Sequence, residues 1–228
     1  MPTPQLHLFS TPGKDDLRDV LEACRHYLED RDEPVVAYLP AGSLSDEWQE
    51  YTERAFHGLA RIETLNTELM TLPEMELALR DAALVYVPGG NTFLLNHRLH
   101  ISKITDYLRK KVAAGLPVVA FSAGTVLCGP NILTSNDLNM VGTSFFKGLD
   151  ATPFNFNVHY PEDPYTRALR DDWLSEYHTF YENPVILLAD GAYVRTEGKK
   201  TTLVQGEAWL LRKGQEKEKV TVGSNIQP

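Results

Sequence analysis

Ser122 combines a nucleophilic side chain with a position where such a side chain can react. The apolar run 116–121 predicts a short buried strand, and it leads directly into Ser122, Ala123 and Gly124, where we expect a helix to begin. A serine at so sharp a strand-to-helix turn exposes its hydroxyl at the sheet edge, beside backbone N–H groups of the following helix. The alternative role is an N-cap, because serine is common before helices. This segment alone leaves both roles open.

A serine nucleophile needs a general base, and the seven histidines are the candidates. Six of them lie in the predicted first strand or in predicted helices: His7, His26, His57, His97, His100 and His178. His159 differs, because it lies in the alternating segment 155–160, just before a proline turn and within a loop-rich half of the chain. Its position favours His159 as the base, with a surface or core histidine as the alternative.

The base in turn needs an orienting acid, and the sequence offers several. Asp190 ends the apolar run 185–189, and a carboxylate at the C-terminal end of a parallel strand lies on the same rim as the serine. Asp190 also begins an Asp-Gly pair, which is a common turn. Asp137 is the alternative acid, and a loop or cap role fits it equally well. Glu182 and Glu197 are weaker candidates.

Backbone N–H groups could stabilise the oxyanion of an acyl transfer. One candidate belongs to Ala123, immediately after the serine. Another belongs to Gly89 or Gly90, because glycine lets the backbone approach a ligand closely. Taken alone, the Pro-Gly-Gly-Asn segment is a tight turn and nothing more.

The elements that must position these residues alternate between strands and helices. Strands are predicted at 6–9, 35–40, 84–87, 118–121 and 184–189, helices at 15–30, 45–58, 93–108 and 166–177, and a hairpin at 193–204 with 209–212 pairing with it or following it. This alternation predicts an α/β fold with a doubly wound, mostly parallel sheet, helices on both faces, and ligands at the C-terminal strand ends. Residues 131–164 are rich in loops, and we expect residues 1–228 to form a single domain.

Composition excludes several classes of function. The chain has 228 residues, a net charge of −9 and no basic run interleaved with aromatic residues, which argues against nucleic acid as a partner. No apolar run approaches a membrane span and no leader is evident, so we expect a cytoplasmic protein without a membrane partner. Cys24 and Cys128 lie in predicted helices, which fits a reducing compartment and offers no metal-ligand spacing.

Three ordered blocks resemble the peptidase E family, serine dipeptidases of family S51 that release N-terminal aspartate and are related to cyanophycinases. The blocks are residues 89–93, 121–124 and 157–160, and segment 134–137 resembles the Thr-Asn-Asp loop of that family. The resemblance covers most of the chain. It implies a fold like that of class I glutamine amidotransferases or flavodoxin, a small peptide substrate, no cofactor or metal, and a possible homodimer.

The same resemblance implies roles for individual residues. Ser122 would be the nucleophile and His159 the general base, with Gly90 and Ala123 supplying the oxyanion N–H groups. The third member in the family is a glutamate before a glycine, and Asp190 occupies that place here. A Ser-His-Asp triad is chemically sufficient, because the acid has only to orient the imidazole and stabilise its charged form.

The chain departs from the family pattern at three places. Asp190 is one methylene shorter than glutamate, so the strand end must come closer or its loop must shift. Ala120 replaces a glycine before the serine, and Pro88 replaces the first glycine of the turn.

Substrate specificity depends on two further residues that the resemblance implies, Asn91 and Arg167. A bidentate guanidinium suits the carboxylate of an aspartate substrate. The alternative for Arg167 is a surface helix arginine, since segment 160–165 lacks the glycines expected there. We therefore predict a serine exopeptidase acting on dipeptides with N-terminal aspartate. The alternatives are a general aminopeptidase or cyanophycinase-like hydrolase, and an inactive binding protein on the same fold.

Overall fold

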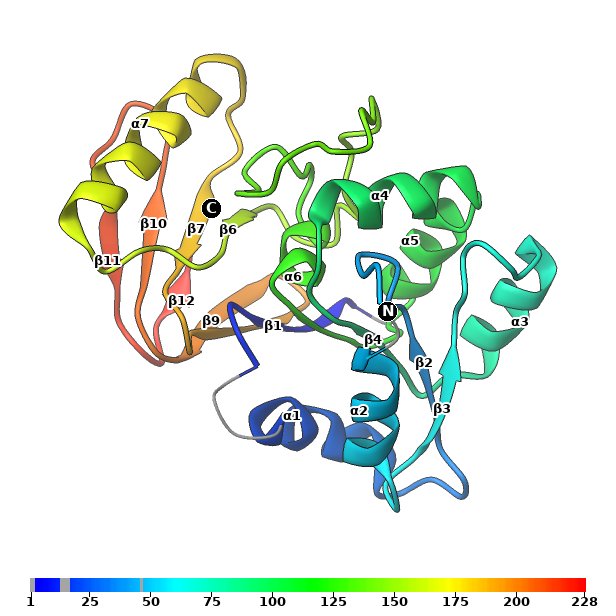
Figure 1. Cartoon of the computed structure of the whole chain (residues 1–228). Helices are drawn as coiled ribbons and strands as arrows, with labels where there is room; N and C mark the ends of the chain where they lie inside the picture. Colours follow the sequence, from blue (N-terminus) through cyan, green and yellow to red (C-terminus); the bar gives the residue numbers. More distant parts are fainter. Residues whose placement is uncertain (1–2, 13–16, 46) are drawn as a thin grey trace.

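A large mixed sheet forms the centre of the computed structural model, which describes residues 3–12, 17–45 and 47–228 (Figure 1). The strand order is β12-β9-β8-β1-β5-β4-β2-β3, and β1 to β5 are parallel to their neighbours among themselves. The strands are β1 (Gln5–Phe9), β2 (Val35–Tyr38), β3 (Arg61–Thr64), β4 (Leu84–Val87), β5 (Val118–Phe121), β8 (Tyr193–Glu197), β9 (Lys200–Gln205) and β12 (Asn225–Ile226). The carboxyl ends of the parallel strands therefore meet at one edge, where the predicted serine lies.

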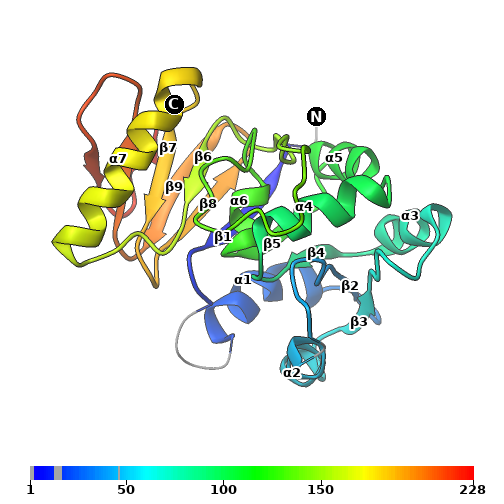
Figure 2. The ribbon, with the colours of Figure 1, turned by 45° about the horizontal axis from the view of Figure 1, so that its top comes forward.

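Helices cover both faces of this sheet, as the alternating pattern predicted (Figure 2). The helices α1 (Arg18–Leu28) and α2 (Glu47–Phe56) pack on one face. The other face carries α3 (Leu72–Asp81), α4 (Thr92–Ile101), α5 (Thr105–Ala113) and α6 (Ala123–Leu127). Successive strand residues explain this arrangement, because Val118 joins one core and Val119 the other.

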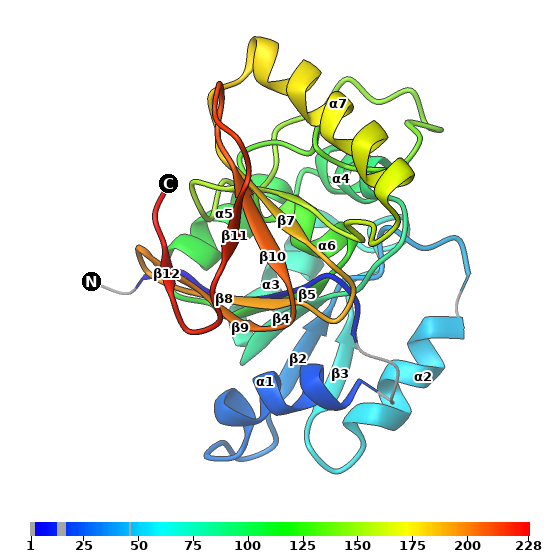
Figure 3. The same cartoon turned by 90° about the vertical axis from the view of Figure 1, so that its left-hand side faces the viewer.

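A second, four-stranded sheet corrects the prediction that strand 184–189 belongs to the central sheet. Its order is β11-β10-β7-β6, built from β6 (Asn155–Asn157), β7 (Val185–Leu188), β10 (Ala208–Leu211) and β11 (Glu218–Val220). The edge of β1 is occupied by the antiparallel β8, so β7 pairs instead with β6 and β10. The helix α7 (Pro164–Phe180) packs on the face turned away from the large sheet (Figure 3).

One hydrophobic core joins the two sheets. Ile186 and Leu188 of β7 belong to the same buried cluster as Leu6 and Leu8 of β1. Hydrophobic burial therefore holds the two sheet edges against each other, and side chains from both can meet at their rims.

Several element boundaries differ from those predicted. The expected helix 93–108 is two helices, α4 and α5, separated by Lys103 with a positive φ of 64°. The sequence interpretation omitted β3 and α3. Residues 13–16 and 46, which belong to the predicted turn and to the first turns of two predicted helices, lie outside the described residues. Among the described helices, none is both long enough and apolar enough to cross a membrane.

Candidate active site

Ser122 lies in a strained turn between β5 and α6. Its φ of 52° and ψ of −116° form a conformation that L-residues rarely adopt, and its N–H donates to the carbonyl of Phe9 at 3.0 Å. A Cβ on Gly124 would lie 2.4 Å from the carbonyl oxygen of Val87, so the helix can start this close to β4 only with glycine there. Within the described chain, the Ser122 hydroxyl makes no capping bond to α6. The N-cap alternative therefore does not account for it.

A chain of hydrogen bonds connects Ser122, His159 and Asp190. The Oγ of Ser122 lies 2.8 Å from Nε2 of His159, and Nδ1 of His159 lies 2.7 Å from Oδ1 of Asp190. The side chains of His159 and Asp190 are 42% and 67% exposed, so the chain opens to solvent. The aspartate reaches the imidazole from the end of β7 despite its shorter side chain, because the second sheet brings that strand end close.

The loop that carries His159 is held by the predicted segment 134–137. The side-chain amide of Asn136 donates to the carbonyl of Val158 at 2.6 Å, and the amide of Asn157 donates to the side-chain oxygen of Asn136, also at 2.6 Å. These bonds fix the backbone on the N-terminal side of His159, which itself adopts a positive φ of 53°. The loop thus orients the imidazole without touching it.

The glycine turn after β4 lies directly beside the serine. A Cβ on Gly89 would come within 3.2 Å of Cβ of Ser122. Gly90 has a φ of +127°, and a Cβ there would lie 2.3 Å from the carbonyl oxygen of Gly42, so no other residue fits. The same carbonyl accepts the N–H of Asn91 at 2.9 Å. The loop after β2, which the sequence interpretation missed, therefore shapes this turn.

Asn91 and Asp137 both serve the N-terminus of α4. The side chain of Asn91 accepts from the N–H of Leu94 at 2.9 Å and donates to the carbonyl of Leu138 at 2.9 Å. Asp137 accepts from the N–H and hydroxyl of Thr92 at 2.8 and 2.6 Å. Asp137 is thus a helix cap, and the alternative that made it the orienting acid is wrong.

The two weaker acid candidates form ion pairs with other residues. Glu182 pairs with Lys213 at 2.6 Å, and Glu197 pairs with Arg195 at 3.3 Å.

Arg167 stands against an aromatic wall. Its guanidinium lies 5.5 Å from the ring centre of Tyr160 and 5.2 Å from that of Trp209, and its Nε donates to the carbonyl of Pro161 at 2.9 Å. Arg167 is not among the described residues that line the cavity at Ser122. The structure therefore places it on α7 against Tyr160 and Trp209, and its contact with the substrate stays a prediction.

A cavity of about 150 Å³ opens at Ser122 and His159. Gly89, Gly90 and Phe121 line it, and Trp48 adds a further aromatic side chain. Sequence reasoning missed Trp48, although one signal was present. The loop after β2 leads to Trp48 at the start of α2. It emerges at the same sheet edge as the serine, because β2 and β5 are both parallel to β4.

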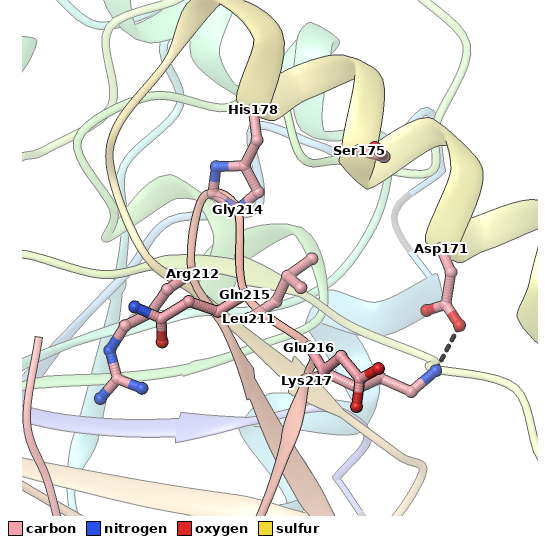
Figure 4. A pocket seen from close by; sticks show the side chains of 9 residues that line it. All are labelled: Asp171, Ser175, His178, Leu211, Arg212, Gly214, Gln215, Glu216 and Lys217. Atoms are coloured by element: carbon pink, nitrogen blue, oxygen red, sulfur yellow. Dashed lines mark hydrogen bonds and ion pairs between the residues drawn. The ribbon is translucent and has the colours of Figure 1, made fainter.

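Two larger cavities contain none of Ser122, His159 and Asp190. One, of about 480 Å³, lies between α7 and the β10–β11 hairpin, where Asp171 and Lys217 form an ion pair (Figure 4). The other, of about 710 Å³, surrounds His7. Among the described residues, no group of three or more His, Cys, Asp or Glu side chains is arranged to hold a metal ion.

The fold and this hydrogen-bonded serine are those of an α/β hydrolytic enzyme, and comparison with known proteins identifies the family. The model of peptidase family S51 matches residues 7–204. The chain therefore belongs to peptidase family S51 and is a serine peptidase.

Individual relatives agree with this assignment. A "Peptidase E" of Streptomyces coelicolor is 32% identical over 217 residues, covering 89% of this chain and 88% of the relative. A "Probable alpha-aspartyl dipeptidase" of Drosophila melanogaster is 39% identical over 141 residues, 60% of this chain and 59% of the fly protein. The crystal structure of a peptidase from an acI-B1 actinobacterium matches with a TM-score of 0.72 at 16% identity, covering 98% of this chain and 96% of that one. This last likeness shows the fold alone.

Proposed function

We propose that this peptidase is an exopeptidase that hydrolyses dipeptides with N-terminal aspartate through an acyl-enzyme on Ser122. The observation that carries the proposal is the hydrogen-bond chain from Ser122 through His159 to Asp190, at 2.8 and 2.7 Å. A carboxylate only accepts hydrogen bonds, so Nδ1 of His159 carries a proton and Nε2 of the neutral ring can accept the serine proton.

The proposed reaction follows from this polarity. As Ser122 attacks the scissile carbonyl, its proton passes to Nε2 of His159, and Asp190 stabilises the resulting imidazolium. The N–H groups of Gly90 and Ala123 stabilise the oxyanion, which the position of the glycine turn beside the serine supports. The imidazolium protonates the leaving amine, and water then hydrolyses the ester by the same steps in reverse.

Two observations support a short substrate with N-terminal aspartate. The cavity at Ser122, at about 150 Å³, is small and suits a dipeptide better than a long chain. Relatives carry the names alpha-aspartyl dipeptidase and peptidase E. Arg167 lies against Tyr160 and Trp209 and does not line the cavity, so the proposed aspartate preference is supported by the names of these relatives.

A panel of dipeptides tests the proposal. We expect Asp-Leu to be cleaved with a kcat/KM at least 10-fold above those of Glu-Leu, Ala-Leu and isoaspartyl-Arg, and we expect the Ser122→Ala protein to be inactive on all four. Equal rates across the α-peptides would indicate a general aminopeptidase, and preference for the isopeptide would indicate a cyanophycinase-like hydrolase. If Ser122 resists a phosphonate serine reagent as well, the chain is a binding protein.

A further inference from the structure

Ser10 is a buried hydroxyl that touches both the proposed base and the proposed acid. It directly follows β1 and is 0% exposed. Its Oγ accepts the backbone N–H of His159 at 2.9 Å. The Ser10 hydroxyl can donate its proton to the carbonyl oxygen of Leu188, at 3.1 Å, or to Oδ1 of Asp190, at 3.4 Å. One hydroxyl thus links the two residues that must act together.

The surrounding end of β1 reaches the rest of the site. The carbonyl of Phe9, the residue before Ser10, accepts the N–H of Ser122 at 3.0 Å. The hydroxyl of Thr11, the residue after it, accepts the N–H of Gly191 at 3.0 Å, next to Asp190. Three consecutive residues therefore connect the serine, which belongs to the large sheet, with the histidine and aspartate, which come from the second sheet.

The bond to His159 has a particular value because of the histidine backbone. His159 has a φ of 53°, a conformation that is unfavourable for an L-residue and persists only where its surroundings impose it. On the N-terminal side, Asn136 holds the carbonyl of Val158. Ser10 holds the N–H of His159 itself, so removing its hydroxyl would free the residue to relax away from Ser122.

We propose that Ser10 is a positioning residue that sets the geometry of the His159–Asp190 pair relative to Ser122. The inference rests on the proposed function, because it requires His159 and Asp190 to act on Ser122. Ser10 itself is assigned no contact with substrate. A displacement of about 1 Å at a reacting pair can cost about 100-fold in rate, so the expected loss is in kcat.

The test compares Ser10→Ala with Thr196→Val. Thr196 is also 0% exposed, and its hydroxyl bonds Thr201 on the β8–β9 hairpin, away from the site. We expect Ser10→Ala to lower kcat on Asp-Leu by about 10- to 100-fold with KM changed less than 3-fold, and to slow phosphonate modification of Ser122 in parallel. Thr196→Val should keep both rates within 2-fold of wild type, even if thermal unfolding shows a comparable loss of stability.

A second variant separates the hydroxyl from side-chain volume. Ser10→Cys keeps a side chain of similar shape but replaces the hydroxyl by a weak donor and acceptor, so its kcat should fall at least 5-fold; it also serves if Ser10→Ala does not fold. Wild-type kcat and phosphonate rate in the Ser10 variants would overturn the inference, as would equal losses in Thr196→Val. A wild-type protein inert to both Asp-Leu and the phosphonate would instead overturn the proposed function.

Discussion

Two histidines of this chain are each held by two side chains, yet their surroundings suit them to different tasks. His159 lies between the hydroxyl of Ser122 and the carboxylate of Asp190. His7, on β1, lies between the hydroxyls of Tyr193 at 2.5 Å and Tyr27 at 2.8 Å. His7 is buried, whereas His159 is exposed to solvent.

The difference shows that hydrogen bonds alone do not suit a histidine to the role of base proposed for His159. Burial, together with the nearby charges of Arg195 and His26, lowers the pKa of His7 to about 4. Its tyrosine partner Tyr193 has a pKa raised by burial, so it supplies no negative charge to stabilise an imidazolium. His159 has a carboxylate partner and access to solvent. The charge of the hydrogen-bond partner and the access of water to the ring decide whether a histidine is suited to accept a proton or to remain a neutral structural group.

Replacing each histidine should give the largest contrast. We expect His159→Ala to lower kcat/KM on Asp-Leu by about 10⁴-fold or more, because the serine loses its proton acceptor. We expect His7→Gln to stay within 3-fold of wild type, since His7 lies in a cavity separate from Ser122. Steady-state kinetics measure both. Comparable losses in the two variants would break the comparison.

Changes at Asp190 sharpen the role of the carboxylate. Asp190→Asn keeps the size but removes the charge, and it should lower kcat by about 10²- to 10⁴-fold. Asp190→Glu introduces the glutamate expected from the resemblance but adds a methylene to a contact already at 2.7 Å, so we expect a loss of about 10-fold. Circular dichroism and unfolding curves control for folding. A fully active Asp190→Asn protein would mean that a neutral partner suffices.

The pH dependence of stability should report on His7. Its pKa is lowered on folding, so between about pH 6.5 and pH 4 the unfolded chain binds a proton that the folded protein does not. The contribution of neutral His7 to the free energy of unfolding is complete above pH 6.5 and is lost as the pH falls toward 4. Urea unfolding of wild type should show on the order of 2 kcal/mol of this loss between pH 7.5 and pH 4.5.

His7→Gln should lack that part of the loss, while His57→Gln, at an exposed helix end, should keep the wild-type slope. Identical slopes in all three proteins would show that His7 does not titrate differently in the two states.

Arg167→Ala should have the smallest effect on catalysis. We expect kcat/KM on Asp-Leu to change less than 3-fold and the free energy of unfolding to fall by about 1 kcal/mol, through lost packing on Tyr160 and Trp209. Parallel assays on Ala-Leu provide the reference. A KM raised more than 10-fold for Asp-Leu alone would instead place Arg167 in the aspartate site.

Much of the fold was predictable, because local patterns dictate it. Buried runs followed by amphipathic segments correctly indicated β1, β2, β4 and β5, with helices on both faces of the sheet, although α3 was not predicted. The hairpin of β8 and β9 was predicted from its Gly198 turn. The second sheet was not predictable, because an apolar run does not reveal which strand edge it will join. The single-domain assignment stays a prediction, supported by the core that the two sheets share.

By itself, the sequence determined the reactive turn. Glycine is required at positions 90 and 124, because a Cβ there would lie 2.3 Å from the carbonyl oxygen of Gly42 and 2.4 Å from that of Val87, respectively. Ser122 lies between these two glycines in the sequence. Tertiary structure alone decided the partners. Strand β8 takes the edge of β1, which leaves Asp190 on the second sheet facing His159, while Asp137 caps α4. Turn chemistry is local and can be inferred from neighbouring residues, whereas hydrogen-bond partners depend on how distant strand edges pair.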